Sequence, residues 1–382
     1  MGNSKVNSNR KSNFELLRIF AMLMIVAFHY AYHGIQKGNI DLISYQGWST
    51  GSIVNKMFTC FLTPGGEIGV ALFFMLTGYF MVRRDFFSLK KIVLECIFYG
   101  ILACGLFIIV KATGHNIPDS ESTMLATDFI STLFNPASGG LFWFVSAYIL
   151  LMLITPFLNR LFNRINYRGM LVFLLFDWFV WYLIPNSIGG TYHLFERAVF
   201  FYSLGALCSL HLQQTKHKEL NLSLFCLSWT GFAICNYVVA SIEANPETPL
   251  KIKVLEKAAN ALGSGLFVVV AALSLFRFFE ATKIRGGAAV INAVASTVFG
   301  VYLIHDSFIG RPFIWDMLFE VSKRQYQSCW YPLMAAGTIL IVFIVCIFVD
   351  MIRQKFIQPK ALEITDNMIE TFQMKFCDNE KG

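Results

Sequence analysis

Ten apolar stretches, most of them close to the length of a membrane-spanning helix, constrain the fold of this chain. A helix needs about 20 mostly apolar residues to cross a bilayer. The stretches are Phe14–Tyr32, Ile68–Val82, Ile92–Val110, Leu141–Leu158, Met170–Ile184, Ala198–Leu212, Leu222–Ser241, Ala258–Phe278, Val290–Ile309 and Pro332–Ile352. Hydrophobic residues make up 56% of the chain and charged ones 14%, against about 45–50% and 25% in soluble proteins. The sequence predicts an all-α, polytopic membrane bundle of about ten helices, with nine or eleven left open.

The lysines and arginines are distributed unevenly between the connections on the two sides of the membrane. If the N-terminus is cytoplasmic, the cytoplasmic segments carry about twice as many lysines and arginines as the outer loops. Arg83, Arg84, Lys90 and Lys91, for example, lie in one cytoplasmic segment. Cytoplasmic loops collect positive charge in this way. We therefore expect both termini in the cytoplasm. The formal net charge of +7 is interpreted as a bias toward the inner leaflet, so no nucleic-acid partner is expected.

The chain is expected to form one membrane domain, residues 14–352, between short cytoplasmic ends. Residues 1–13 are a polar N-terminal arm, and residues 353–382 are a short tail of mixed charge. The two largest outer connections, His33 to Glu67 and Ala112 to Gly140, are rich in Gly, Ser, Thr, Asn and Pro. They are interpreted either as the mouth of a site or as solvated loops. No internal repeat is visible that would indicate an inverted-repeat transporter.

The first stretch holds two ionisable residues on one helix face. Arg18 and His29 flank an almost unbroken apolar run, and they are eleven positions apart. At about 100° per residue, eleven positions end about 20° past three full turns, and they span about 16 Å along the axis. An ionisable group at membrane depth is costly and marks a functional site by default. The alternatives are a snorkelling cation for Arg18 and a hydrogen-bonded packing residue for His29.

Five segments, taken in order, resemble the membrane-bound acyltransferase family 3, of the bacterial cell-surface polysaccharide O-acetyltransferase type. They are the Arg-x10-His pattern in NFELLRIFAMLMIVAFHY, LFFMLTGYF followed by Arg83 and Arg84, LFWFVSAYILLMLITP, RAVFFYSLGAL and STVFGVYLIHD. Thr77 stands where the family usually has Ser. The resemblance covers the chain from Asn13 to about Asp350. It implies a multi-pass protein of the bacterial cell membrane that acylates carbohydrates or other envelope molecules.

On the cytoplasmic side, the resemblance and the predicted topology together place a cationic group. Arg18, Arg83 and Arg84 suit the phosphates of coenzyme A through charge-assisted hydrogen bonds. For Arg83 and Arg84 the alternative is the positive-inside rule itself. Glu15, one turn before Arg18, is expected to pair with it.

Toward the outer side, several polar and aromatic residues from different stretches are predicted at one level, as an acceptor site around His29. They are Glu67, Trp143, Glu196, Arg197, Tyr302, His305 and Asp306. Aromatic rings stack on sugar faces, and carboxylates bind hydroxyls or orient a histidine. The alternatives are an interfacial aromatic belt and a charge pair that anchors one helix. Since Glu196 and Arg197 point about 100° apart on a helix, each is expected to have another partner.

The pair His29 and His33 has a spacing that can ligate zinc. No HExxH-type context accompanies it, and the resemblance implies no metal. We therefore expect no metal and no permanently bound cofactor, with an acyl-CoA as donor substrate only.

These residues favour acyl transfer as the function. The hypothesis is transfer of an acyl group, acetyl from acetyl-CoA before succinyl or others, to a hydroxyl of a capsular or exopolysaccharide. His29 would act as general base or carry the acyl group, and Arg18 would hold the donor. Thr77 would bind the oxyanion or simply its own helix. A secondary transporter or flippase is the alternative function, and a scaffold within an envelope assembly machinery is a third.

Overall fold

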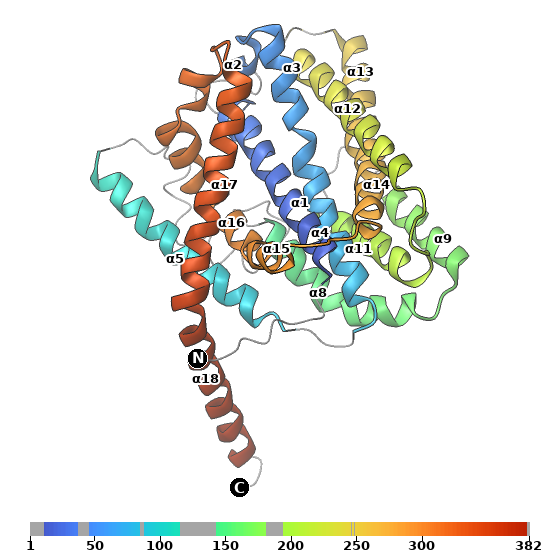
Figure 1. Cartoon of the computed structure of the whole chain (residues 1–382), viewed down its shortest axis with the longest axis vertical. Coiled ribbons are helices and arrows are strands. Elements are labelled where there is room, and N and C mark those ends of the chain that lie inside the picture. The colour runs from blue at the N-terminus through green and yellow to red at the C-terminus, as the bar shows by residue number, and fades with distance from the viewer. Residues whose placement is uncertain are drawn as a thin grey trace.

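The chain folds entirely into helices within the part that the structure describes. The structure is a computed structural model, and it describes residues 11–36, 46–84, 88–114, 143–180, 194–245, 247 and 249–379. The α-helices are α1 (Ser12–Ala31), α2 (Gln46–Ser49), α3 (Ile53–Leu62), α4 (Pro64–Met81), α5 (Lys90–Ala112), α8 (Trp143–Phe162), α9 (Tyr167–Trp178), α11 (Leu194–Leu210), α12 (Lys218–Glu243), α13 (Leu250–Asn260), α14 (Val268–Glu280), α15 (Ala288–Ala295), α16 (Val298–His305), α17 (Tyr331–Phe356) and α18 (Gln358–Asn379), as Figure 1 shows. The wider π-helical turns are η1 (Tyr32–Gln36), η3 (Ala261–Phe267), η4 (Pro312–Leu318) and η5 (Val321–Gln325). The predicted all-α class is confirmed.

Eight helical segments of the described residues are long and apolar enough to cross a membrane. They are Ser12–Gln36, Ile53–Met81, Lys90–Ala112, Trp143–Phe162, Lys218–Glu243, Ile252–Glu280, Ala288–His305 and Tyr331–Phe356. The other two predicted stretches contain α9 and α11, which have 12 and 17 residues. Part of the predicted stretch that contains α9, residues 181–184, lies outside the described residues. The polytopic bundle is confirmed, and the count of ten stays a prediction.

The outer connection from His33 to Glu67 holds helices that its polar composition did not predict. Ser52 caps α3 by accepting a hydrogen bond from the backbone N–H of Asn55 at 3.2 Å. Pro64 stands in the first turn of α4, where its missing N–H breaks no hydrogen bond. The span therefore begins at Ile53 instead of Ile68. Most of the other large connection, residues 115–140, lies outside the described residues, as does most of the N-terminal arm.

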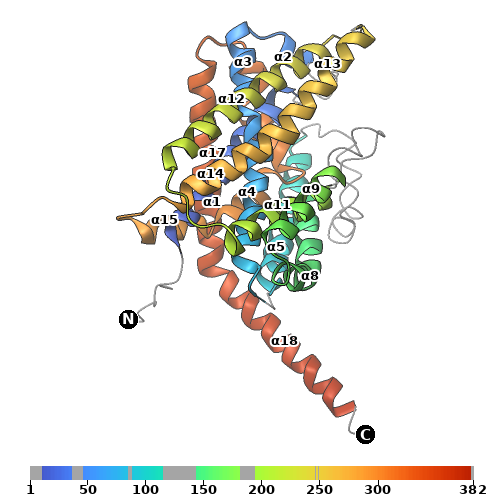
Figure 2. The same ribbon diagram turned by 90° about the vertical axis from the view of Figure 1, so that its right-hand side faces the viewer.

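The described part of the C-terminal tail is helical, a feature that the sequence analysis left open. In both views α18 continues from the end of α17 and extends away from the bundle (Figures 1 and 2). Lys90, at the start of α5, forms an ion pair with Asp366 of α18. The tail is thus joined to the bundle near the start of α5.

Helices α4 and α11 lie close together, and two glycines make this approach possible. A Cβ on Gly78 would lie 1.9 Å from the carbonyl oxygen of Tyr202, and one on Gly205 would lie 2.0 Å from that of Met75. Small residues let helix backbones approach in this way inside membranes. On its other side α4 packs along α1, so the contact between α4 and α11 supports the helix that carries Arg18 and His29.

We expect Gly205→Ala to destabilise the bundle. The added methyl must push two backbones apart, which typically costs about 1–3 kcal/mol. Gly337→Ala is the matched control, because nothing lies within 4 Å of a Cβ at Gly337, which also sits inside a helix. Thermal unfolding of the detergent-purified variants measures the difference. Equal midpoints for the two variants would contradict the close approach.

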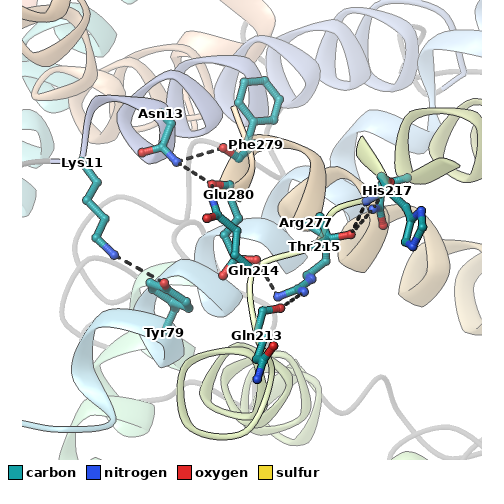
Figure 3. A network of polar contacts seen from close by, with 11 residues as sticks. Lys11, Asn13, Tyr79, Gln213, Gln214, Thr215, His217, Arg277, Phe279 and Glu280 are labelled. Carbon is teal, nitrogen blue, oxygen red and sulfur yellow. Dashed lines mark hydrogen bonds and ion pairs between the residues drawn. The ribbon is translucent and has the colours of Figure 1, made fainter. Parts of the chain in front are cut away.

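A network of polar contacts lies where α1 begins (Figure 3). The side chain of Asn13 donates to the carbonyl oxygens of Phe279 and Glu280, at 2.9 and 3.3 Å, and Gln214 donates to the second at 2.6 Å. Arg277 forms an ion pair with the Glu280 carboxylate at 2.5 Å. The last carbonyls of a helix have no partner within it. The network therefore caps α14 and fixes the start of α1 beside it.

Candidate active site

One large cavity runs through the bundle along α1. Its volume is about 990 Å³, and α4, α5, α8, α11, α15 and α16 supply the other walls. Along α1 the lining residues include Arg18, Met22, Ile25 and His29, which follow each other at intervals of three and four positions. Residues at this spacing share one face of a helix. Arg18 and His29 thus face the same cavity, as their spacing predicted.

At the His29 end of the cavity, four charged or titratable side chains surround the imidazole. Nδ1 of His29 lies 2.8 Å from Nε2 of His305, and Nε2 of His29 lies 3.6 Å from Oδ1 of Asp306. His33 places its Nε2 at the same distance from this oxygen, 3.6 Å. Arg311 donates to it from Nε at 2.7 Å. Asp306 is 1% exposed, so its charge depends on these partners.

A second ion pair lies at the same end, from α4 to α11. Arg197 donates from Nη2 to Glu67 at 2.8 Å, and Ser264 donates to the other carboxylate oxygen at 3.1 Å. Arg197 therefore has a partner outside its own helix, as expected from its position beside Glu196. Trp143 and Tyr302 complete this part of the wall.

The structure brings most of the predicted acceptor residues together. The lining includes His29, Glu67, Trp143, Arg197, Tyr302 and Asp306, but not Glu196 or His305. His305 contacts His29 from behind the cavity wall, and it is completely buried.

At the Arg18 end, the guanidinium is partly open to the cavity. Arg18 donates to Glu15 at 2.6 Å, which is the pairing expected from their spacing, and its side chain is 29% exposed. Thr77 and Tyr148 line the cavity nearby. The Thr77 hydroxyl donates to the carbonyl oxygen of Phe73 at 2.8 Å, which is the bond to its own helix.

Arg83 and Arg84 do not line the cavity with Arg18. Both are exposed beyond the end of α4, and Arg83 donates from Nη2 to the carbonyl oxygen of Ser209 at 2.9 Å. The predicted cationic group of three arginines is therefore divided between the cavity and the protein surface.

Sequence reasoning missed a buried charge cluster that reaches the cavity. Glu95 lines the cavity, and its Oε1 forms an ion pair with Nη2 of Arg353 at 2.9 Å. Asp350 accepts from Nε of Arg353 at 2.7 Å and from the hydroxyl of Tyr99 at 2.7 Å. Glu95 and Asp350 both lie inside predicted apolar stretches, and a carboxylate at that depth is the signal that indicates such a site.

His29, His33 and Asp306 are also the described residues that can hold a metal ion together. Their ligand atoms all lie within 4.8 Å of one another. The Asp306 oxygen that they share is already 2.7 Å from the Arg311 guanidinium, which balances its charge. We assign no metal to this cluster.

Comparison with known families identifies the type of enzyme. The model of acyltransferase family 3, described as an acyltransferase domain, matches residues 11–351. The chain belongs to this family. The five motifs therefore predicted the family correctly. No curated protein and no solved structure matches the chain significantly.

In this acyltransferase Arg18 and His29 line the same cavity and are separated along α1 by apolar lining residues. On α1 the lining residues between Arg18 and His29 include the apolar Met22 and Ile25, and Phe73 and Phe144 add apolar wall beside polar residues such as Thr77 and Glu95. Arg18 and His29 are about 16 Å apart along α1. A site of this shape can hold an anionic group at one end and a reacting hydroxyl at the other, with an extended chain shielded from water between them.

Proposed function

We propose that this acyltransferase moves an acyl group from an acyl-CoA, acetyl-CoA in the first place, to a hydroxyl of a cell-envelope carbohydrate. One observation carries the proposal: Arg18 and His29 line a single cavity, and the α1 residues that line it between them, such as Met22 and Ile25, are apolar. The family assignment supports transfer over the alternative of a transporter or flippase. The enzyme would work in the bacterial cell membrane and would serve capsular or exopolysaccharide assembly, either alone or with that machinery.

The donor enters from the cytoplasm in this proposal. Its phosphates meet Arg18, because a guanidinium binds phosphate through charge-assisted hydrogen bonds. The pantetheine arm extends along the apolar walls and carries the thioester toward His29. Arg83 and Arg84 contact only the part of the donor that projects beyond the cavity.

The acceptor binds from the outer side. Trp143 and Tyr302 offer ring surfaces to a sugar, and Glu67 and Arg197 offer hydrogen bonds to its hydroxyls. A hydroxyl is a poor nucleophile at neutral pH, so His29 takes its proton while the oxygen attacks the thioester carbonyl. The carbon–sulfur bond breaks, and the departing thiolate receives the proton as the free thiol of CoA. Asp306 stabilises the imidazolium that exists between these steps. An acyl-histidine is the alternative route.

We expect Arg18→Gln to weaken donor binding. Losing a hydrogen bond to a charged group costs about 1.5–3 kcal/mol, so the KM for the acyl-CoA should rise by about 10- to 100-fold. Membranes are incubated with labelled acetyl-CoA, or succinyl-CoA, and with candidate glycans, and transferred label is measured per amount of enzyme.

Two further variants control this experiment. The double variant Glu15→Gln with Arg18→Gln leaves no unpaired carboxylate at this position. If its KM for the acyl-CoA rises as much as that of Arg18→Gln, the rise reports weaker donor binding and not misfolding. Arg160→Gln removes an exposed arginine outside the cavity and should leave KM unchanged. An unchanged KM in both Arg18 variants contradicts the proposed donor site. Wild-type enzyme that transfers no label from any acyl-CoA contradicts the function itself.

A further inference from the structure

A chain of two hydrogen bonds links His29 to the backbone of α16. Nδ1 of His305 lies 2.5 Å from the carbonyl oxygen of Val301, and Nε2 of His305 lies 2.8 Å from Nδ1 of His29. His305 is 0% exposed and does not line the cavity. His305 therefore does not contact a ligand in the cavity directly, and its hydrogen-bond contact toward the cavity is with His29.

The direction of both hydrogen bonds follows from the last acceptor in the chain. A carbonyl oxygen can only accept, so Nδ1 of His305 carries a hydrogen. A neutral imidazole has a hydrogen on one nitrogen only, so Nε2 of His305 is bare and accepts from Nδ1 of His29. In the neutral form of His29 the hydrogen is then on Nδ1, and its Nε2 is bare.

The bare nitrogen faces a residue that lines the cavity, Asp306, whereas Nδ1 faces His305, which does not line it. His29 lines the cavity, and its Nε2 lies 3.6 Å from the Asp306 carboxylate, which is itself held by Arg311 at 2.7 Å. The negative charge of Asp306 therefore stabilises a proton that Nε2 accepts. We propose that His305 is a positioning residue, which fixes the tautomer of His29 so that Nε2 is the nitrogen that accepts the hydroxyl proton. This role of His305 rests on the proposed function.

The end of α16 holds the two neighbouring residues in place. The helix stops at His305, and the backbone N–H of Asp306 still donates to the carbonyl oxygen of Tyr302 at 3.0 Å. His305 consequently contacts one ring nitrogen of His29, and Asp306 faces the other. The ring of Tyr302 packs edge-on against that of His305, with an interplanar angle of 82°. One helix end thus sets both the orientation and the protonated nitrogen of His29.

Two substitutions of similar length test this role. In His305→Gln the side-chain oxygen can still accept from Nδ1 of His29, whereas in His305→Met only a weak sulfur acceptor remains. We expect His305→Met to lower kcat by about 10²- to 10⁴-fold with an unchanged KM for the acyl-CoA, since a wrong tautomer cannot serve as the base. His305→Gln should retain kcat within about tenfold of wild type.

Nitrogen-15 NMR of histidine-labelled protein gives a readout that needs no activity. The His29 signals, assigned by their loss in His29→Gln, should show a hydrogen on Nδ1 in wild type and in His305→Gln. They should show the Nε2-protonated form in His305→Met. Hydrogen on Nε2 of His29 in the wild-type enzyme overturns the proposal, as does full activity in His305→Met or equal inactivity in both folded variants. If wild type transfers no acyl group but shows the Nδ1-protonated form, the proposed function fails and the tautomer assignment stands.

Discussion

Replacing His29 with glutamine will lower the rate of acyl transfer by about 10²- to 10⁴-fold, the usual contribution of a general base. Glutamine has nearly the same length and can still bond to His305, but it cannot take a proton from a hydroxyl at neutral pH. The loss is therefore expected in kcat, while the KM for the acyl-CoA, which is set at the Arg18 end, stays close to wild type. Initial rates with labelled acetyl-CoA measure both constants.

His217→Gln is the matched control, because it makes the same chemical change at an exposed histidine whose side chain does not cap α12. Acid-quenched samples add a second measurement. Label that stays on wild-type enzyme but not on His29→Gln supports an acyl-histidine, and turnover without label on the enzyme supports direct transfer. Undiminished transfer by His29→Gln at equal protein level would refute the role of His29 as base or carrier.

The sequence predicted those features of the site that depend on local geometry. The rotation and rise of a helix alone place Arg18 and His29 on one face, and the cavity lies along that face. The pairing of Arg18 with Glu15, three positions away, is equally local. The apolar stretches predicted the all-α bundle because a membrane requires each spanning helix to satisfy its own backbone.

The contacts around His29 could not be predicted in the same way. His29 and His305 are 276 positions apart, so only the packing of α1 against α16 brings their rings together. The pairing of Asp306 with Arg311 depends on the turn after α16, whose conformation the sequence pattern does not specify. The role of Arg83 and Arg84 could not be predicted for a different reason. The positive-inside rule and phosphate binding both favour arginines at the cytoplasmic end of a spanning helix, so the sequence does not distinguish the two roles.

The cluster of Glu95, Asp350 and Arg353 should produce the largest effect on folding. Arg353→Met leaves two buried carboxylates without their cation, and breaking a buried ion pair costs about 3–5 kcal/mol. The side chains of Arg353 and Asp350 are 5% and 0% exposed, so water cannot replace the lost charge. We expect little Arg353→Met protein in membranes and a lowered midpoint of thermal unfolding in detergent. Lys355→Met, on the same helix but exposed, should behave like wild type.

A triple variant separates the charge of this cluster from its packing. Arg353→Met combined with Glu95→Gln and Asp350→Asn removes all three charges, and most of the lost stability should return because no buried carboxylate is left unpaired. If Arg353→Met alone is as stable as Lys355→Met, the two carboxylates are not held as charges by Arg353. Glu95 lines the cavity, so the donor KM of the recovered triple variant measures whether its carboxylate also contacts the substrate. A rise in KM at restored stability would assign Glu95 to the donor site, and an unchanged KM would make the cluster a support that joins α5 to α17.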